Sequence, residues 1–238
     1  MEKPSKGKKA KAKPTREKPS NKRPPKELQV KAKQARENPP KEKQIKERPT
    51  SYCAAVLTME KDNVHIHYHD KEYGFPIEND NELFARLVLE INQAGLSWTT
   101  ILKKKDNFFR AFDDFDIAKV ARYGDRQVER LLNDAGIIRN RLKVAAAIGN
   151  AKVILDLQKK HGSFKNWIDL HHPLSKEEWV KLFKNTFRFT GGEIVGEFLM
   201  STGYLPGAHI ESCATYKKLM KHKPAWSVVK KTPAKDGK

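Results

Sequence analysis

The two cysteines of the chain are the residues whose type and spacing point most directly to chemistry. Cys213 follows His209 by four positions in HIESC, a spacing that can bring two ligands to one metal ion. Cys53 precedes three histidines in VHIHYHD, residues 64–70. Two cysteines and two histidines would form a closed, tetrahedral, structural zinc site that joins the two ends of a folded domain. Two ordinary buried thiols beside surface histidines would give the same pattern, and spacing alone leaves both interpretations open.

The carboxylate of Glu90 is the second candidate, because it lies within an apolar stripe. The segment DNELFARLVLEINQAG predicts a helix that Asp80 caps and that ends near Gly95. At about 100° per residue, Glu90 shares a face with Leu83 and Leu87. Burying an unpaired carboxylate is costly, so Glu90 is either a functional group inside the domain or a residue at the rim of the stripe.

Helical patterns position the remaining candidates. DRQVERLLNDAG predicts a helix closed by Gly136, a second helix runs to about Gly162, and a third covers Glu177–Lys184. Few alternating β-branched runs occur, so the domain is expected to be mainly α. FRFTGG, residues 187–192, separates two further helical stretches. Its two glycines could let backbone N–H groups approach a phosphate, or could serve only a tight turn.

The charge of the chain is concentrated at its ends. Residues 1–50 hold 18 basic and 6 acidic residues, 8 of the 13 prolines and no Phe, Tyr or Trp, which predicts a disordered basic arm. Residues 217–238 hold 8 basic residues and 1 acidic residue and are expected to form a basic tail. Residues 51–216 carry 22 charges of each sign and form the predicted single domain. Basic ends around a neutral domain favour contact with a polyanion, although solubility or localisation would explain them too.

Several classes of protein are excluded at this stage. Two cysteines cannot build a disulfide framework, and apolar runs of about six residues are too short for a membrane span. No apolar signal segment follows Met1. An intracellular protein without membrane contact is therefore expected.

Four segments closely resemble the DNA-3-methyladenine glycosylase I family, often called Tag. The similarity runs from about Cys53 to Cys213, and its motifs are YHDKEYGFP (68–76), LEINQAGLSWTTILKK (89–104), NDAGIIRNRLKVAAAIGNA (133–151) and FRFTGG (187–192). The resemblance implies an all-α, helix-hairpin-helix glycosylase domain. It also implies a monomeric, monofunctional hydrolase that excises 3-methyladenine from alkylated double-stranded DNA in the cytoplasm and nucleoid, or in the nucleus of a eukaryote.

The resemblance assigns roles in a base-binding pocket. Glu90 falls on the family's pocket carboxylate and is expected to be ionised when it receives the base. Tyr68 and Trp98 would enclose the flipped base, and Tyr73 stands where the motif more often has tryptophan. Stacking on these rings would favour a cationic base.

The resemblance also assigns contacts with DNA. Thr190, Gly191 and Gly192 would present backbone N–H groups to a phosphate. Leu96 could wedge into the gap that the flipped base leaves, or make only a hydrophobic contact at a helix end. No lysine suggests itself as a Schiff-base nucleophile.

The ligands of a structural zinc ion would be Cys53, His69, His209 and Cys213. Fifteen residues separate Cys53 from His69, a longer spacing than is usual in the family. Two alternatives to an enzyme stay open at this point, a non-catalytic protein that binds alkyl lesions and a general DNA-binding protein.

Overall fold

The computed structural model describes residues 49–228, which form an all-helical unit without strands. The predicted basic arm, residues 1–50, lies outside the described residues except for its last two positions. Of the predicted tail, residues 217–228 are described. The expectation of an all-α fold is therefore confirmed for the described part of the chain.

The helices follow one another with short connections. The first half contains α1 (Tyr52–Leu57), α2 (Val64–Lys71), α3 (Asp80–Gln93), α4 (Trp98–Ala111), the 3-10 helix η1 (Asp113–Phe115) and α5 (Ile117–Val120). The second half contains α6 (Asp125–Asn133), α7 (Arg141–His161), α8 (Phe164–His171), α9 (Lys176–Thr186), α10 (Gly192–Ser201), α11 (Ala214–Lys221) and η2 (Ala225–Ser227). Within residues 49–228, no helix is long and apolar enough to cross a membrane.

Local sequence explains why most of these helices begin where they do. Eight of them start after a residue whose side-chain oxygen accepts a hydrogen bond from a backbone N–H of the first turn, namely Ser51, Asn63, Asn79, Ser97, Asp116, Asn140, Ser163 and Ser175. Each such cap stabilises its helix by about 1 kcal/mol. α7 ends at Gly162, whose φ of 84° is easily reached only by glycine.

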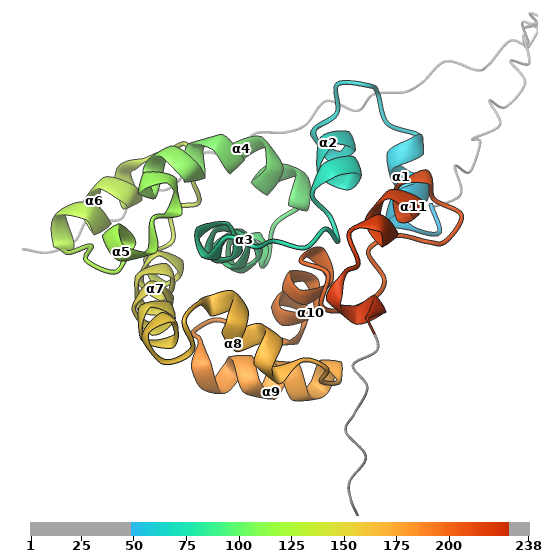
Figure 1. Ribbon diagram of the computed structural model, residues 1–238. Coiled ribbons are helices and arrows are strands. Elements are labelled where there is room, and N and C mark those ends of the chain that lie inside the picture. Colours follow the sequence, from blue (N-terminus) through green and yellow to red (C-terminus); the bar gives the residue numbers. More distant parts are fainter. Residues whose placement is uncertain (1–48, 229–238) are drawn as a thin grey trace, which may run out of the picture. The chain divides into compact units, whose positions relative to one another are not determined.

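Helix α3 lies at the centre of the described unit. It packs against α4, α7, α8 and α10, which surround it in Figure 1. Every residue from Leu83 to Asn92 is buried, so this helix has no solvent-exposed face along most of its length. Glu90 is only 4% exposed, which excludes the interpretation that it lies at the rim of an apolar stripe.

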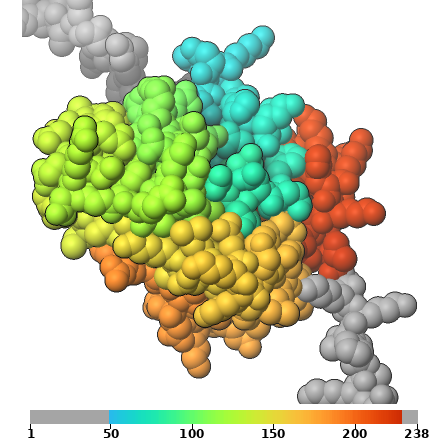
Figure 2. All heavy atoms as spheres, turned by 60° about the vertical axis from the view of Figure 1, so that its left-hand side comes forward, coloured from blue at the N-terminus to red at the C-terminus, as the bar shows by residue number. Residues whose placement is uncertain are grey.

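The two ends of the described chain lie side by side. Figure 2 shows the segment nearest the N-terminus next to the segment nearest the C-terminus on one face. The predicted domain boundary after residue 216 falls inside α11, where Leu219 is 1% exposed. The backbone N–H of Trp226 donates to the carbonyl of Gly203 at 3.3 Å. The packed unit therefore continues beyond residue 216.

Asp80 does not cap its own helix as the sequence suggested. Asn79 is the N-cap of α3, and its Oδ1 accepts from the backbone N–H groups of Asn81 and Glu82. The Asp80 carboxylate instead accepts from the backbone N–H groups of Phe164, at 2.7 Å, and Lys165, at 3.0 Å. It also accepts from Nε2 of Gln158 in α7 at 2.7 Å. Asp80 thus joins the start of α3 to α7 and to the first turn of α8.

We expect Asp80→Ala to lower the free energy of unfolding by about 2–3 kcal/mol, because it removes an ionised acceptor shared by three donors. Asn79→Ala is the matched control and should lower it by only about 1 kcal/mol, as for an ordinary N-cap. Urea unfolding of the full chain measures both values. Equal losses in the two variants would show that the contacts of Asp80 to α7 and α8 contribute nothing beyond a local cap.

Candidate active site and metal centre

A cavity of about 670 Å³ opens between α1, α2, α3, α4 and α10. Its walls combine aromatic and acidic side chains, and no lysine or arginine lines it among the described residues. The lining residues are Tyr52, Met59, His65, Tyr68, Tyr73, Glu90, Gln93, Trp98, Thr99, Glu193 and Glu197. The carboxylate and the three aromatic residues expected to bind the base therefore line one cavity, which we call the acidic pocket.

The aromatic walls of the acidic pocket contact one another directly. The ring centroids of Tyr68 and Trp98 lie 5.2 Å apart with an interplanar angle of 62°. Those of Tyr68 and Tyr73 lie 5.4 Å apart at 34°. A base stacked between two parallel rings needs the usual stacking distance of about 3.5–4 Å on each side, so the two rings would lie about 7–8 Å apart. Tyr68 and Trp98 therefore form a corner with one face and one edge in this structure.

Glu90 is the most deeply buried acid of the pocket. No residue between 49 and 228 hydrogen-bonds to its carboxylate, and burial raises its pKa to about 8. Arg86 lies one turn earlier on α3 and opposes this rise, while the charge of Glu197 adds to it. Burial thus favours the protonated form of this side chain in the free protein, and the expectation that it is ionised concerned the carboxylate beside a bound base. A cationic ligand beside it would favour release of that proton.

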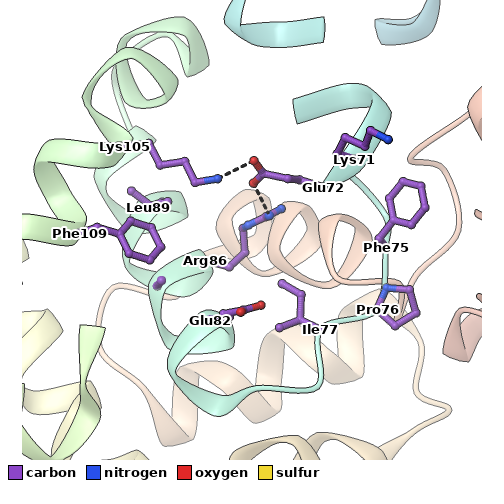
Figure 3. Close-up of a pocket in the computed structure, with 11 residues that line it drawn as sticks. Lys71, Glu72, Phe75, Pro76, Ile77, Glu82, Arg86, Leu89, Lys105 and Phe109 are labelled. Atoms are coloured by element: carbon purple, nitrogen blue, oxygen red, sulfur yellow. Dashed lines mark hydrogen bonds and ion pairs between the residues drawn. The ribbon is translucent and has the colours of Figure 1, made fainter. Parts of the chain in front are cut away.

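Arg86 is directed away from Glu90 into a network that the sequence did not reveal. Its Nη1 donates to the hydroxyl of Tyr68 at 3.1 Å, and its Nη2 lies 3.2 Å from Oε2 of Glu72. Nζ of Lys105 lies 2.5 Å from the other oxygen of Glu72, so this carboxylate is held between two cations (Figure 3). These contacts tie α2, α3 and α4 together and fix the hydroxyl of Tyr68 at the pocket wall.

Figure 3 shows a second, smaller cavity of about 330 Å³ around this network. Arg86, Glu72 and Lys105 line it and are paired with one another. Because its charged groups already have partners, this cavity offers a ligand fewer unpaired charged groups than the acidic pocket does. A signal for Arg86 existed in the sequence, since it precedes Glu90 by four residues on the same helix face.

The histidines near Cys53 separate into different environments. His65 is buried at the pocket wall, where its ring nitrogens contact the hydroxyl of Tyr52 at 2.8 Å and that of Thr99 at 2.7 Å. Burial lowers the pKa of His65, so its imidazole is neutral at pH 7. His67 is exposed and lies beside Glu72. Only the third histidine of the run, His69, joins the cysteines.

Cys53, His69, His209 and Cys213 come together into one group that could hold a metal ion. One ligand atom from each lies within 4.8 Å of the others. Sγ of Cys53 is 3.6 Å from Nδ1 of His209, and Sγ of Cys213 is 3.7 Å from Nε2 of His69. With bonds of about 2.3 Å to sulfur and 2.0 Å to nitrogen, tetrahedral zinc would set such pairs about 3.6 Å apart. The donor set and its spacing fit a closed tetrahedral site.

The other ring nitrogen of each histidine in this group is already engaged. Nδ1 of His69 lies 2.7 Å from Oδ1 of Asp70, which also accepts from the hydroxyl of Thr215. Nε2 of His209 donates to the carbonyl of Tyr73 at 2.8 Å. Such outer contacts orient a ligating imidazole and select its tautomer. They leave Nε2 of His69 and Nδ1 of His209 turned toward the thiols.

The hairpin between α9 and α10 holds the residues expected to contact DNA. The hydroxyl of Thr190 is buried and donates to the carbonyls of Phe183 and Phe187, closing the end of α9. A Cβ added at Gly191 or Gly192 would meet no atom within 4 Å, and neither glycine has a positive φ. Packing and backbone conformation therefore do not require glycine at these positions. Open space at the start of α10 suits close approach by a ligand.

The loop that carries Leu96 is held at the end of α3. Nζ of Lys143 donates to the carbonyls of Asn92, at 3.0 Å, and Ala94, at 2.8 Å. Gly95 follows with a φ of 82°, and Leu96 is 39% exposed at the tip. A cation at the carboxyl end of a helix also interacts favourably with the helix dipole. Leu96 thus projects from a fixed loop between α3 and α4.

The fold and the pocket together define a helical class of protein with an aromatic and acidic cavity, and solved structures share this architecture. The chain resembles a solved 3-methyladenine DNA glycosylase I from Staphylococcus aureus, whose structure was described as the structural basis of 3-methyladenine recognition. The TM-score is 0.60 and the sequence identity is 30%, and the match covers 66% of this chain and 93% of that one. A further crystal structure of 3-methyladenine DNA glycosylase I gives a TM-score of 0.59 and 32% identity, covering 66% of this chain and 96% of that one.

Sequence comparison identifies the family. A model of the methyladenine glycosylase family matches residues 58–175. The chain is 35% identical to DNA-3-methyladenine glycosylase 1 of Escherichia coli over 66% of this chain and 94% of that protein. It is 32% identical to DNA-3-methyladenine glycosylase of Haemophilus influenzae over 63% of this chain and 91% of that protein. The chain belongs to the methyladenine glycosylase family.

The raised pKa of Glu90 predicts how Glu90→Gln changes stability with pH. Between its ordinary value of about 4.5 and about 8, the folded protein holds a proton that the unfolded chain has released, so this group destabilises the fold increasingly as pH rises. Glutamine lacks this penalty. We therefore expect Glu90→Gln to be more stable than the natural chain at about pH 9, by on the order of 3 kcal/mol, and much closer to it at about pH 5.

Urea unfolding at both pH values measures this difference. Glu82→Gln is the matched control, because Glu82 lies on the same helix but is exposed. It should show little change with pH. A stability difference for Glu90→Gln that is constant between the two pH values would contradict the raised pKa.

Proposed function

We propose that the chain is a monofunctional DNA glycosylase that hydrolyses the N-glycosidic bond of 3-methyladenine in alkylated double-stranded DNA, as a step of base excision repair. The observation that carries this proposal is the buried Glu90 among the rings of Tyr68, Tyr73 and Trp98, in a member of the methyladenine glycosylase family. Such an enzyme must extract the nucleotide from the stacked duplex, recognise the base and admit water. The acidic pocket provides the recognition step.

Charge is the property by which this pocket would select its base. The base of a 3-methyladenine nucleotide is cationic, and its glycosidic bond is already weakened. The aromatic corner of Tyr68 and Trp98 favours a cation by roughly 0.5–2 kcal/mol for each ring. Glu90 accepts hydrogen bonds from the adenine edge once it is ionised. Because its pKa is about 8 in the free protein, a cationic base binds with release of its proton, whereas neutral adenine leaves the carboxyl protonated.

Two exposed elements would contact the DNA outside the pocket. The N–H groups of Thr190, Gly191 and Gly192 bind a phosphate at the start of α10, and the open space around both glycines supports this role. Leu96, exposed at the tip of the α3–α4 loop, fills the gap left by the flipped base. No lysine lines the described pocket, which favours hydrolysis without a Schiff-base lyase step.

Cys53, His69, His209 and Cys213 would hold a structural zinc ion. Burial raises the pKa of the Cys53 thiol and lowers the pKa of His209, so that in the metal-free protein both groups are uncharged. A bound cation would stabilise the thiolates and use the neutral imidazoles as ligands. Its contribution is to join α1 and α2 to the segment before α11, close to the aromatic wall of the pocket.

Glu90→Gln should reduce single-turnover release of 3-methyladenine by roughly 10²-fold, because the glutamine cannot supply the negative charge. Trp98→Ala should lose about 1–3 kcal/mol of stacking on the base. Both are measured by incubating methylated duplex DNA with the full chain and separating the released bases by chromatography. Undiminished release by Glu90→Gln would contradict the role of this carboxylate. Lesion binding without any base release by the natural chain would favour a non-catalytic lesion-binding protein.

One equivalent of zinc should accompany the purified protein, measured by elemental analysis. Cys213→Ser, or removal of the metal by a chelator, should lower the melting temperature of the chain, because structural zinc contributes directly to the folding free energy. His67→Ala is the matched control, since His67 belongs to the same histidine run but is exposed. It should leave both metal content and melting temperature unchanged. Full stability in a metal-free preparation would contradict the zinc site.

A further inference from the structure

The acidic pocket contains a second carboxylate that no motif of the sequence singled out. Glu197 lies on α10 and lines the pocket together with Glu90 of α3. The hydroxyl of Tyr73 donates to Oε2 of Glu197 at 3.3 Å. Glu197 is only partly buried, whereas Glu90 is 4% exposed.

The surroundings of Glu197 are unfavourable to a negative charge in the free protein. Burial and the nearby carboxylate of Glu193 raise its pKa, whereas the hydrogen bond from Tyr73 and the charge of Lys176 oppose the rise. Lys176 is itself 3.8 Å from Glu193, at the exposed edge of α10. The charge of Glu197 raises the pKa of Glu90, because two ionised carboxylates in one cavity without a lysine or arginine in its lining would repel each other. A positive ligand in the pocket would reverse this repulsion.

We propose that Glu197 is a second specificity-determining residue, which acts with Glu90 to make the pocket select a cationic purine over a neutral one. This inference rests on the proposed function. Tyr73 positions Glu197, because its hydroxyl fixes one carboxylate oxygen at the pocket wall. The carbonyl of Tyr73 accepts from His209, so the metal-binding group also helps to hold this tyrosine in place.

The test compares two ligands of one shape and different charge. The 3,9-dimethyladeninium cation carries the positive charge of the lesion, and its 3-deaza analogue, with carbon in place of N3, is neutral. Calorimetric titration of the full chain at about pH 8.5 keeps most of Glu90 ionised. Glu197→Gln keeps the size of the side chain and removes its charge. Glu177→Gln is the matched control, because Glu177 is an exposed acid in the first turn of α9 and does not line the pocket.

We expect Glu197→Gln to weaken binding of the cation by roughly five- to twentyfold, and binding of the neutral analogue by less than about twofold. Glu177→Gln should change both affinities by less than about twofold. Tyr73→Phe removes only the hydroxyl and should lower the ratio of cation affinity to neutral-analogue affinity by a smaller factor. This variant tests the inference if Glu197→Gln does not fold. Equal weakening of the binding of both ligands would show that Glu197 has only a packing role. Unchanged binding of both ligands would show that Glu197 has no role in binding. Either result overturns the inference.

The failure of the inference can be told from the failure of the proposed function. A natural chain that releases no 3-methyladenine from methylated DNA overturns the proposed function. A natural chain that releases the base, with an unaltered ratio of cation to neutral affinity in Glu197→Gln, overturns only the role of Glu197.

Discussion

A carboxyl group on the most buried helix is the constraint on which the rest of this structure depends. Glu90 lies on α3, surrounded by α4, α7, α8 and α10, without a hydrogen-bond partner among residues 49–228. Such a group is tolerated because it keeps its proton, as its pKa of about 8 indicates. The free protein therefore stores a charge that it can develop when a cation arrives. The proposed selectivity for a cationic base and the cost of Glu90 to the stability of the fold have the same physical origin, the burial of this carboxyl group.

The groups around this carboxyl are arranged so that no side chain satisfies it. Arg86 is near enough to lower the pKa of Glu90 but donates its hydrogen bonds to Tyr68 and Glu72. If Arg86 formed an ion pair with Glu90, the negative charge would be neutralised inside the protein and would attract a cationic base less strongly. Arg86 instead fixes the aromatic wall, and the pocket keeps its acidic character.

The group that could hold a metal ion and the pocket contain residues that are neighbours in the chain or in space. His69 follows Tyr68, which lines the pocket, and His209 donates to the carbonyl of Tyr73. Cys53 follows Tyr52, another residue of the lining. A metal ion held by this group would therefore limit movement of the aromatic wall as well as join the ends of the described unit. Such an ion would couple the stability of the described unit to the shape of the pocket through these neighbouring residues.

Local patterns in the sequence were sufficient for several of the helices. Capping residues and apolar periodicity act within about four residues, so they predicted α3, α7, α9 and the glycine at the end of α7. The family motifs brought the four metal-binding side chains and the pocket residues to attention. Only the tertiary structure decided that Asp80 binds α7 and α8, that burial raises the pKa of Glu90, and that Tyr68 and Trp98 meet at an angle. It also decided that Arg86 binds the hydroxyl of Tyr68 and that Glu197 lines the pocket. A pKa and a ring angle depend on desolvation and on distances between helices far apart in the chain, and no local pattern encodes these quantities.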